Sequence, residues 1–270
     1  MNWAAALRSE LASRAQTFAS ERSIPHSLSC GKSPVVCFPR CSEGFHGNFY
    51  PASFAALHAH SEWRRRLDKV HSSAKQIFPR VEGERWRELD SCMSSDALLM
   101  NIFCHPGVAR NRDVCRILAV EGDDGPHYGF RPRVPLLNDR LDRTEVDMKI
   151  DDLLVEAKLT ENDFQRCRKP SVHRYRDFLE VFADEQLRQD ETYYYSYQLI
   201  RNVLAAHASR GALCVLLDSR RPDLLDQWYD VMKCVRPVEL RTRCKVLTWQ
   251  ELSHHLPSSL REFLAIKYGI

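Results

Sequence analysis

Two neighbouring segments in the middle of the chain alternate polar and apolar residues with a period of two. They span residues 144–150 (TEVDMKI) and 153–159 (LLVEAKL), and two aspartates separate them. Alternation on both sides of a short polar turn is typical of an antiparallel β-hairpin. If the two aspartates form the turn, Asp147 lies directly opposite Glu156. The chain is therefore expected to build part of its core around a sheet.

The same alternation predicts a charged face on this hairpin. Glu145, Asp147, Glu156 and Lys158 project to one side, while apolar residues project to the other. Two facing carboxylates repel each other unless a cation neutralises them. Mg²⁺ does so, typically through one or two carboxylates plus water and substrate phosphate. Glu145 is an alternative ligand if the strand register shifts. A solvent-facing hairpin, in which Glu145 and Lys158 form an ordinary surface ion pair, is the competing interpretation.

Helical and strand patterns surround the hairpin. The continuous apolar run 212–217 is typical of a strand buried on both faces, and with the hairpin it predicts an α/β fold around a mixed sheet. Further short strands are expected over 35–38, 116–120 and 244–247, and a turn over 121–126. Helices are expected over 1–24, 51–77, 94–105, 171–188, 191–208 and 222–233 and at the C-terminal end, with an irregular segment over 25–51.

The composition is that of an ordinary globular protein. The hydrophobic fraction is 44% and the charged fraction 28%, with 39 basic and 36 acidic residues. No apolar run reaches the roughly 18 residues that a membrane-spanning helix needs, so a membrane protein is not expected. Charged residues interrupt the first 22 positions, where a secretory signal would be apolar. The ten cysteines are irregularly spaced, which favours a reducing, cytoplasmic setting.

One group of cysteines is spaced closely enough to serve a metal. Cys30, Cys37, Cys41 and His46 could together supply four ligands to a structural zinc ion. Their spacing matches no common zinc motif, so loose or buried thiols are the alternative. With zinc bound, this segment would form a zinc-stabilised interaction module.

The hairpin and its flanking elements resemble a known superfamily. Asp147 followed by Glu156-Ala157-Lys158, between helices and a further core strand, is similar to the PD-(D/E)XK phosphodiesterases, which include many restriction and repair nucleases. Val146 stands where the motif has its leading proline. The resemblance covers roughly residues 94–246. It extends to an uncharacterised bacterial branch of restriction-endonuclease-like proteins through segments 46–49, 63–71 and 94–103.

The resemblance implies a restriction-endonuclease-like core of αβββαβ order, with a mixed central sheet flanked by helices. This core is expected in residues 86–270. Residues 1–85 are expected to form a helical and cysteine-containing N-terminal extension that packs on the core.

The resemblance also implies roles for individual residues. Asp147 and Glu156 would bind Mg²⁺, with Mn²⁺ as a substitute, and the carbonyl of Ala157 would be a further ligand. Lys158 would support the attacking water. Gln198, on the helix after this motif, would reach the active site.

Several other residues are candidates for contact with substrate. Gln198, Arg201 and Asn202 recur at helical spacing and so share one helix face. Tyrosines 193–195 and 197 could stack on bases or belong to the core. His46 and Asn48 are expected to line the cleft, and Asp96 and Asn101 to cap and pack their helix. The residues best placed for phosphate contact are Arg166, Arg168, Lys169, Arg174 and Arg176. The basic run 64–66 is either solvated helix surface or a further phosphate contact.

These observations predict a Mg²⁺-dependent phosphodiesterase that cleaves DNA, an endonuclease of restriction or repair type. DNA is the expected partner, no membrane contact is expected, and a homodimer is left open. The alternative is a catalytically inactive nucleic-acid-binding protein on the same fold, in which the acids form surface ion pairs and the arginines bind nucleic acid.

Overall fold

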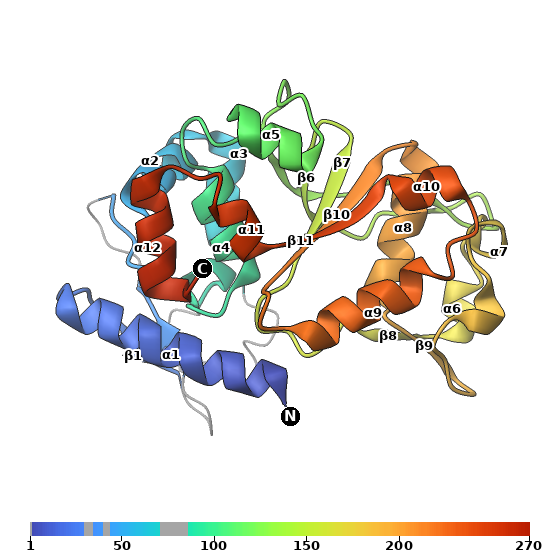
Figure 1. Cartoon of the computed structure of the whole chain (residues 1–270), viewed down its shortest axis with the longest axis horizontal. Helices are drawn as coiled ribbons and strands as arrows, with labels where there is room; N and C mark the ends of the chain where they lie inside the picture. Colours follow the sequence, from blue (N-terminus) through green and yellow to red (C-terminus); the bar gives the residue numbers. More distant parts are fainter. Residues whose placement is uncertain (1, 30–34, 40–43, 71–85) are drawn as a thin grey trace. The chain divides into compact units, whose positions relative to one another are not determined.

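The computed structural model describes residues 2–29, 35–39, 44–70 and 86–270 (Figure 1). The chain divides into two compact units. The terminal unit comprises Met1–Ile117 and Trp249–Ile270, and the sheet unit comprises Leu118–Thr248. The C-terminal segment thus belongs to the same unit as the N-terminal residues. The division into residues 1–85 and 86–270 stays a prediction.

A five-stranded mixed sheet forms the centre of the sheet unit. Its strand order is β11-β10-β7-β6-β3. The β3–β6 and β6–β7 pairs are antiparallel, and β10 runs parallel to both β7 and β11. With its flanking helices this sheet confirms the predicted α/β class and is consistent with a restriction-endonuclease-like fold. The strands are β3 (His127–Phe130), β6 (Val146–Ile150), β7 (Leu153–Ala157), β10 (Ala212–Leu217) and β11 (Cys244–Thr248).

The hairpin β6–β7 has the predicted register. Ile150 faces Leu153 and Met148 faces Val155, with the two aspartates as the turn. Asp151 adopts a φ of 47°, in the left-handed region. Every residue of β7 is buried, because β10 pairs along its other edge. The hairpin is therefore a central part of the sheet and not a solvent-facing surface hairpin.

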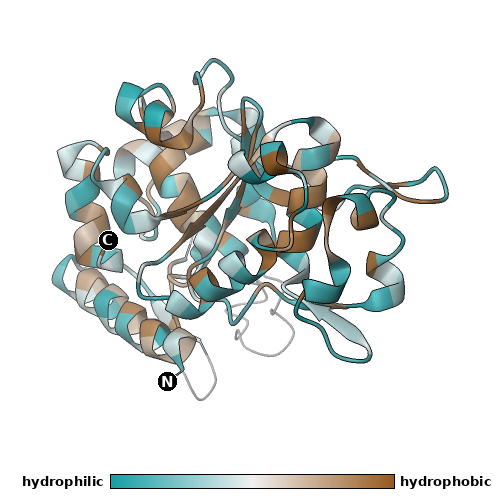
Figure 2. Ribbon diagram, turned by 45° about the vertical axis from the view of Figure 1, so that its right-hand side comes forward, coloured by the Kyte–Doolittle hydropathy of each residue, from teal (hydrophilic) through white to brown (hydrophobic). Residues whose placement is uncertain are grey.

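Helix α8 (Tyr197–Ser209) covers the sheet face that carries the charged residues. Val203 and Ala206 of this helix share one hydrophobic cluster with Leu154 of β7 and Val215 of β10. Helix α9 (Pro222–Met232) adds Trp228 to the same cluster. Apolar colouring follows the central strands in Figure 2, as expected for buried strands.

Three predictions of secondary structure were wrong. The expected strand at 116–120 is mostly occupied by helix α5 (Arg112–Leu118), whose start is capped where Asn111 Oδ1 accepts the N–H groups of Asp113 and Val114. The expected helix at 171–188 is instead a series of short turns, α6 (Lys169–Val172), α7 (Phe178–Val181) and a 3₁₀ turn (Asp184–Gln186), with apolar residues buried at irregular intervals.

The third error concerns the helix expected over 191–208. Its first residues form strand β9 (Tyr193–Tyr195), which pairs with β8 (Arg166–Arg168), and the helix starts only at Tyr197. Ser196 has a φ of 55°, which interrupts the helical path. Strand β3 was not predicted, because its four residues include a glycine and show no clear alternation.

The terminal unit is mainly helical. Its first helix packs against its last one, and Ser94 Oγ accepts the N–H of Ala97 as the predicted N-cap of α4. The predicted helix over 51–77 is broken into short segments up to residue 68, and residues 71–77 lie outside the described chain. The expected strand near 35–38 is present only as a two-residue pair. The elements are α1 (Trp3–Glu21), β1 (Ser27–Leu28), β2 (Val36–Cys37), α2 (Pro51–Ala59), α3 (Ser61–Arg64), two 3₁₀ turns (Arg65–Asp68 and Glu88–Asp90), α4 (Ser95–Phe103), α11 (Trp249–Ser253) and α12 (Ser258–Tyr268).

Small elements complete the sheet unit. Strands β4 (Val134–Pro135) and β5 (Leu141–Asp142) form a short antiparallel pair, and α10 (Val238–Thr242) precedes β11. Among the described residues, none of the helices combines the length and the apolar character needed to cross a bilayer.

Candidate functional site

The hairpin register brings the predicted acidic residues together. Met148 faces Val155, so Asp147 and Glu156 are the next facing positions. Asp147 is half-buried, and its Oδ2 accepts the main-chain N–H of Ala157 at 2.8 Å. Lys158 follows directly, and its own N–H donates to the carbonyl of Leu216 in β10. The pleat and the ladder thus place these residues on one end of the hairpin.

Glu156 is the centre of this group. Its side chain is almost fully buried, and the residue is 2% exposed. Glu156 Oε1 accepts a hydrogen bond from Lys158 Nζ at 2.8 Å, and Oε2 accepts one from Asn202 Nδ2 at 2.9 Å. A buried carboxylate is stable only where donors of this kind replace water.

Lys158 carries a buried positive charge. The residue is 5% exposed, and burial alone would lower the pKa of its ammonium group. The carboxylates of Glu156, Glu161 and Asp147, together with the hydrogen bond to Glu156, outweigh burial and raise the pKa above its ordinary value. These surroundings therefore favour the ammonium form of Lys158.

Glu161 belongs to this group, although the sequence did not single it out. It lies in the loop after β7, and its Oε2 accepts the N–H of Leu159 at 2.7 Å. No periodicity extends to this loop, so only the folded path of the chain brings Glu161 near Lys158. An acidic residue three positions after the motif was the only available signal.

Two neighbouring residues of α8 reinforce Glu156. Arg201 is 4% exposed, and its Nε and Nη2 donate to Asn202 Oδ1 at 3.1 and 2.7 Å. Arg201 Nη2 also donates to the carbonyl of Glu145 at 3.1 Å. These bonds fix the amide of Asn202 with its nitrogen toward Glu156. Both residues were predicted to bind substrate, and the structure connects them to the acidic group.

Gln198 lies one helical turn before Asn202. Its main-chain N–H donates to the carbonyl of Phe164 at 2.9 Å, and the Phe164 ring centroid lies 5.7 Å from Lys158 Nζ. Gln198 Oε1 is buried and has no hydrogen-bond partner among the described residues. A buried acceptor without a partner is costly, so this oxygen is suited to receive a donor from outside the chain. The predicted catalytic role of Gln198 stays a prediction.

The oxygen atoms of the acidic group are ligands that suit a hard divalent cation. The two carboxylates of Asp147 and Glu156 and the carbonyl of Ala157 are oxygen ligands on adjacent strands, the kind that Mg²⁺ prefers. Within the described residues, however, no three His, Cys, Asp or Glu side chains are arranged to hold a metal ion. An ion at this position would have to rely on two carboxylates, a carbonyl and water.

A known protein family matches nearly the whole chain. Residues 11–269 match the family described as Restriction Endonuclease associating with ARP. The chain belongs to this family. Its description indicates a nuclease-like function with DNA as the substrate, and the match spans both compact units. Neither the curated proteins nor the solved structures gave a significant match.

In this family member the structure places His46 and Asn48 in the terminal unit. His46 Nε2 lies 3.1 Å from Asp90 Oδ1, and Asn48 Nδ2 donates to the carbonyls of Leu89 and Ser91. Both side chains are buried and connect the segment before α2 to the turn before α4. The contacts seen here hold the unit together, and the expected contact with substrate stays a prediction.

The cysteine cluster is only partly described. Cys37 is buried, which raises the pKa of its thiol, and His46 contacts Asp90. Cys30 and Cys41 lie outside the described residues. The predicted zinc site is therefore an untested expectation.

Asn101 packs within its helix as predicted, whereas Asp96 pairs with two cations and Ser94 provides the helix cap. Asp96 Oδ2 accepts hydrogen bonds from Arg66 Nη2 and Lys69 Nζ, both at 2.8 Å. Burial would raise the pKa of Asp96, but these two cations outweigh it and lower the pKa. Asn101 Oδ1 accepts the N–H of Tyr50 at 2.7 Å. One residue of the basic run 64–66 is thus engaged in a buried ion pair.

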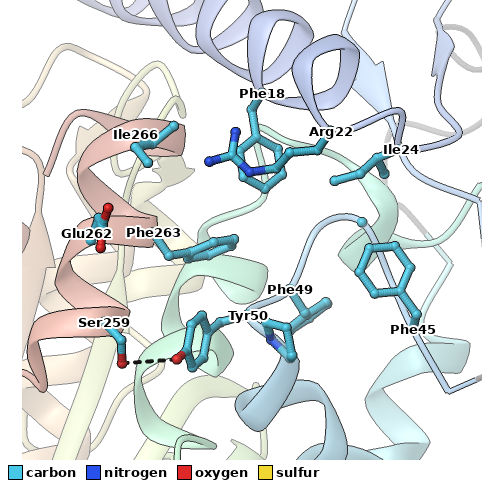
Figure 3. Close-up of a pocket in the computed structure, with 12 residues that line it drawn as sticks. Phe18, Arg22, Ile24, Phe45, Phe49, Tyr50, Ser259, Glu262, Phe263 and Ile266 are labelled. Atoms are coloured by element: carbon cyan, nitrogen blue, oxygen red, sulfur yellow. Dashed lines mark hydrogen bonds between the residues drawn. The ribbon is translucent and has the colours of Figure 1, made fainter.

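A cavity of about 390 Å³ opens in the terminal unit (Figure 3). Aromatic rings of Phe18, Phe49 and Phe263 surround it, and Tyr50 donates to Ser259 Oγ at 3.0 Å at one side. Its walls contain none of the residues predicted for catalysis.

Proposed function

We propose that this chain is a Mg²⁺-dependent phosphodiesterase that cleaves DNA, an endonuclease of restriction or repair type. The observation that carries the proposal is the meeting of Asp147, Glu156 and Lys158 on facing positions of a buried hairpin. The carboxylates of Asp147 and Glu156 are ligands that suit a hard cation. Lys158 lies beside them, and its pKa is raised although it is buried. The family description supports a nuclease.

In this proposal, the residues of the site have separate roles, which follow from their charges and positions. Asp147, Glu156 and the Ala157 carbonyl would hold Mg²⁺, and Mn²⁺ would substitute for it. The ion would supply Lewis acidity toward phosphate oxygen and water. Lys158 offers a preorganised positive charge to an anionic phosphoryl group. Asn202 and Arg201 keep the Glu156 carboxylate oriented through their chain of hydrogen bonds.

Replacement of Asp147 tests this proposal most directly. Asp147→Asn keeps the size of the side chain and removes its charge, and we expect at least a 100-fold loss of Mg²⁺-dependent cleavage. The assay compares plasmid, linear duplex and single-stranded DNA with Mg²⁺, with Mn²⁺ and with excess chelator. Circular dichroism and a melting curve verify that the variant folds. Full cleavage by this variant, or by the parent protein in chelator, would contradict the mechanism.

One observation favours the second candidate, a catalytically inactive nucleic-acid-binding protein. Both oxygens of Glu156 and one oxygen of Asp147 already accept hydrogen bonds from groups of the same chain. Calorimetric titration with Ca²⁺ separates the two candidates, since a metal-dependent enzyme binds the ion and loses that binding in Asp147→Asn. DNA binding without ion binding or cleavage would favour the inactive protein.

A further inference from the structure

A short two-stranded arm leaves the sheet unit beside the acidic group. Its strands are β8 and β9, in which Arg166 faces Tyr195 and Arg168 faces Tyr193. The middle pair points inward, and Tyr194 is buried in the main hydrophobic cluster. Because side chains alternate along a strand, the other four residues share the opposite face. We call this set, Arg166, Arg168, Tyr193 and Tyr195, the arm face.

Guanidinium groups lie over both tyrosine rings of the arm face, one from Arg166 and one from Arg188, which is outside this set. The guanidinium carbon of Arg166 lies 4.5 Å from the ring centroid of Tyr193, and that of Arg188 lies 5.3 Å from the ring of Tyr195. Arg166 and Arg168 are exposed, and both tyrosines are half-buried. A guanidinium stacked on a ring keeps its N–H groups at the edge, where they can still bind phosphate.

Asp190 holds the turn that leads into β9. Its Oδ1 accepts the N–H groups of Thr192 and Tyr193 at 2.8 and 2.7 Å, and its Oδ2 accepts the hydroxyl of Tyr195 at 2.7 Å. These bonds fix one tyrosine ring before any ligand arrives, which lowers the entropy cost of binding. The Asp190 carboxylate also attracts Arg166, so a phosphate on the arm face competes with it for this arginine.

Both strands of the arm are close in sequence to residues that surround the proposed catalytic group. β8 starts two residues after Phe164, whose ring lies against Lys158, and β9 leads through Ser196 into α8. Gln198 N–H bonds to the Phe164 carbonyl, and Tyr197 N–H bonds to the Gln165 carbonyl. The arm is therefore a direct extension of the residues that surround Lys158.

We propose that the arm face binds unpaired nucleotides next to the cleavage position, an inference that rests on the proposed function. Arg166 and Arg168 would contact phosphates, and bases would stack on the arginine–tyrosine layers. Stacking contributes about 1–3 kcal/mol per base in single-strand binding proteins and is tolerant of sequence. Paired bases in a duplex have their faces covered by their neighbours, so a stacking surface of this kind favours single-stranded DNA, a flap or a frayed end over intact duplex.

The test measures binding apart from cleavage. Fluorescence anisotropy in chelator compares a labelled single-stranded oligonucleotide with a duplex of the same sequence. We expect Tyr193→Leu to weaken single-strand binding about tenfold and to leave duplex binding within twofold. Tyr193→Phe keeps the ring and should bind as the parent does. Arg166→Gln should reduce the slope of log affinity against log salt by about one phosphate contact.

A matched control removes a charge elsewhere in the same unit. Arg236 is exposed between α9 and α10 and is not part of the arm face, and Arg236→Gln makes the same change in charge. The arm proposal would be overturned if the arm variants bind single strands as well as Arg236→Gln does. It would also be overturned if they lose affinity for duplex and for single strands equally. In either case, cleavage by the parent protein would leave the proposed function intact. A parent protein that binds neither form of DNA would overturn both proposals.

Discussion

Among the described residues, each compact unit buries one lysine, and the surroundings of these two lysines are opposite. In the sheet unit, Lys158 lies among Glu156, Glu161 and Asp147, which raise the pKa of its ammonium group despite burial. In the terminal unit, Lys267 is 1% exposed, and its Nζ donates to the carbonyl of Gly47 at 3.1 Å. Burial lowers the pKa of Lys267 well below its ordinary value, and Cys92 opposes this shift.

Aromatic rings take the place of carboxylates around Lys267. Its Nζ lies 4.5 Å from the ring centroid of Phe38 and between 5.3 and 5.5 Å from those of Phe18, Phe263 and Tyr268. Its long aliphatic stem fills space among these rings, as a methionine would. A buried lysine is thus not by itself a sign of chemistry. The carboxylates beside Lys158 make the difference, because they keep its charge in place for an anionic substrate.

The largest expected effect comes from exchanging each lysine for methionine. Lys158→Met should reduce kcat/KM for DNA cleavage at least 100-fold, because it removes the preorganised charge. Lys267→Met should leave kcat/KM within about twofold. Because Lys158→Met leaves Glu156 buried without its cation, its melting temperature should fall as well, and cleavage is measured below that temperature. Equal activity of the two variants would contradict the comparison.

The second prediction concerns metal binding. Asn202→Ala removes the hydrogen bond to Glu156 Oε2, so that the carboxylate is less well oriented. We expect the Mg²⁺ concentration for half-maximal cleavage to rise about 10- to 100-fold, the usual cost of losing such a supporting contact. Activity at saturating Mg²⁺ should recover in part. Gln189→Ala serves as a control for loss of an amide on another element, and an equal rise there would refute the assigned role of Asn202.

The third prediction uses pH to examine Lys267. The pKa of Lys267 is lower in the folded chain than in the unfolded chain. At a pH between these two pKa values, Lys267 holds a proton in the unfolded chain and lacks it in the folded chain. The penalty of burying this amine is therefore largest at low pH and disappears as pH rises toward 10.5. Lys267→Met should raise the free energy of unfolding at pH 7, because it removes the cost of burying this amine. The gain should shrink between pH 7 and 9.5 in urea unfolding curves of parent and variant.

An opposite pH trend would show that Lys267 is held charged by its aromatic rings. In that case the gain from methionine would stay constant or grow with pH, and the contrast with Lys158 would fail. The difference between parent and variant is the informative quantity, since other groups titrate equally in both proteins.

The smallest effect is expected at Gln198. Gln198→Leu replaces a buried oxygen that has no partner within the described residues, so it should leave the melting temperature unchanged or raise it slightly. If this oxygen receives a donor from substrate or water, cleavage should fall by up to about tenfold in the same variant. A variant that is both less stable and fully active would assign Gln198 to the packing of α8 alone.

Local patterns predicted much of the sheet unit. The alternation in 144–159 led to the correct register of β6 and β7, and the apolar run at 212–217 is the buried strand β10. Ser94 caps its helix as its residue type predicts. These features follow from neighbours in sequence, because side-chain period and capping bonds act over a few residues.

Local patterns predicted the wrong secondary structure where a segment packs against or pairs with residues distant in the sequence. Tyr193–Tyr195 were predicted to be part of a helix, but they form a strand because they pair with β8. The helix expected at 171–188 is a series of turns, since its apolar residues fill irregular gaps in the main cluster. Tertiary packing overrides weak local preference in both places.

The sequence by itself determined which residues could act as an acidic pair with a lysine, since the two-residue period aligns Asp147, Glu156 and Lys158. Only the tertiary structure decided which groups surround these residues and which charge state each one favours. It brings Asn202 and Glu161 to Glu156 and Lys158, and it encloses Lys267 among rings instead. The reason is physical: faces and caps depend on local geometry, whereas the charge of a buried group depends on every element packed around it.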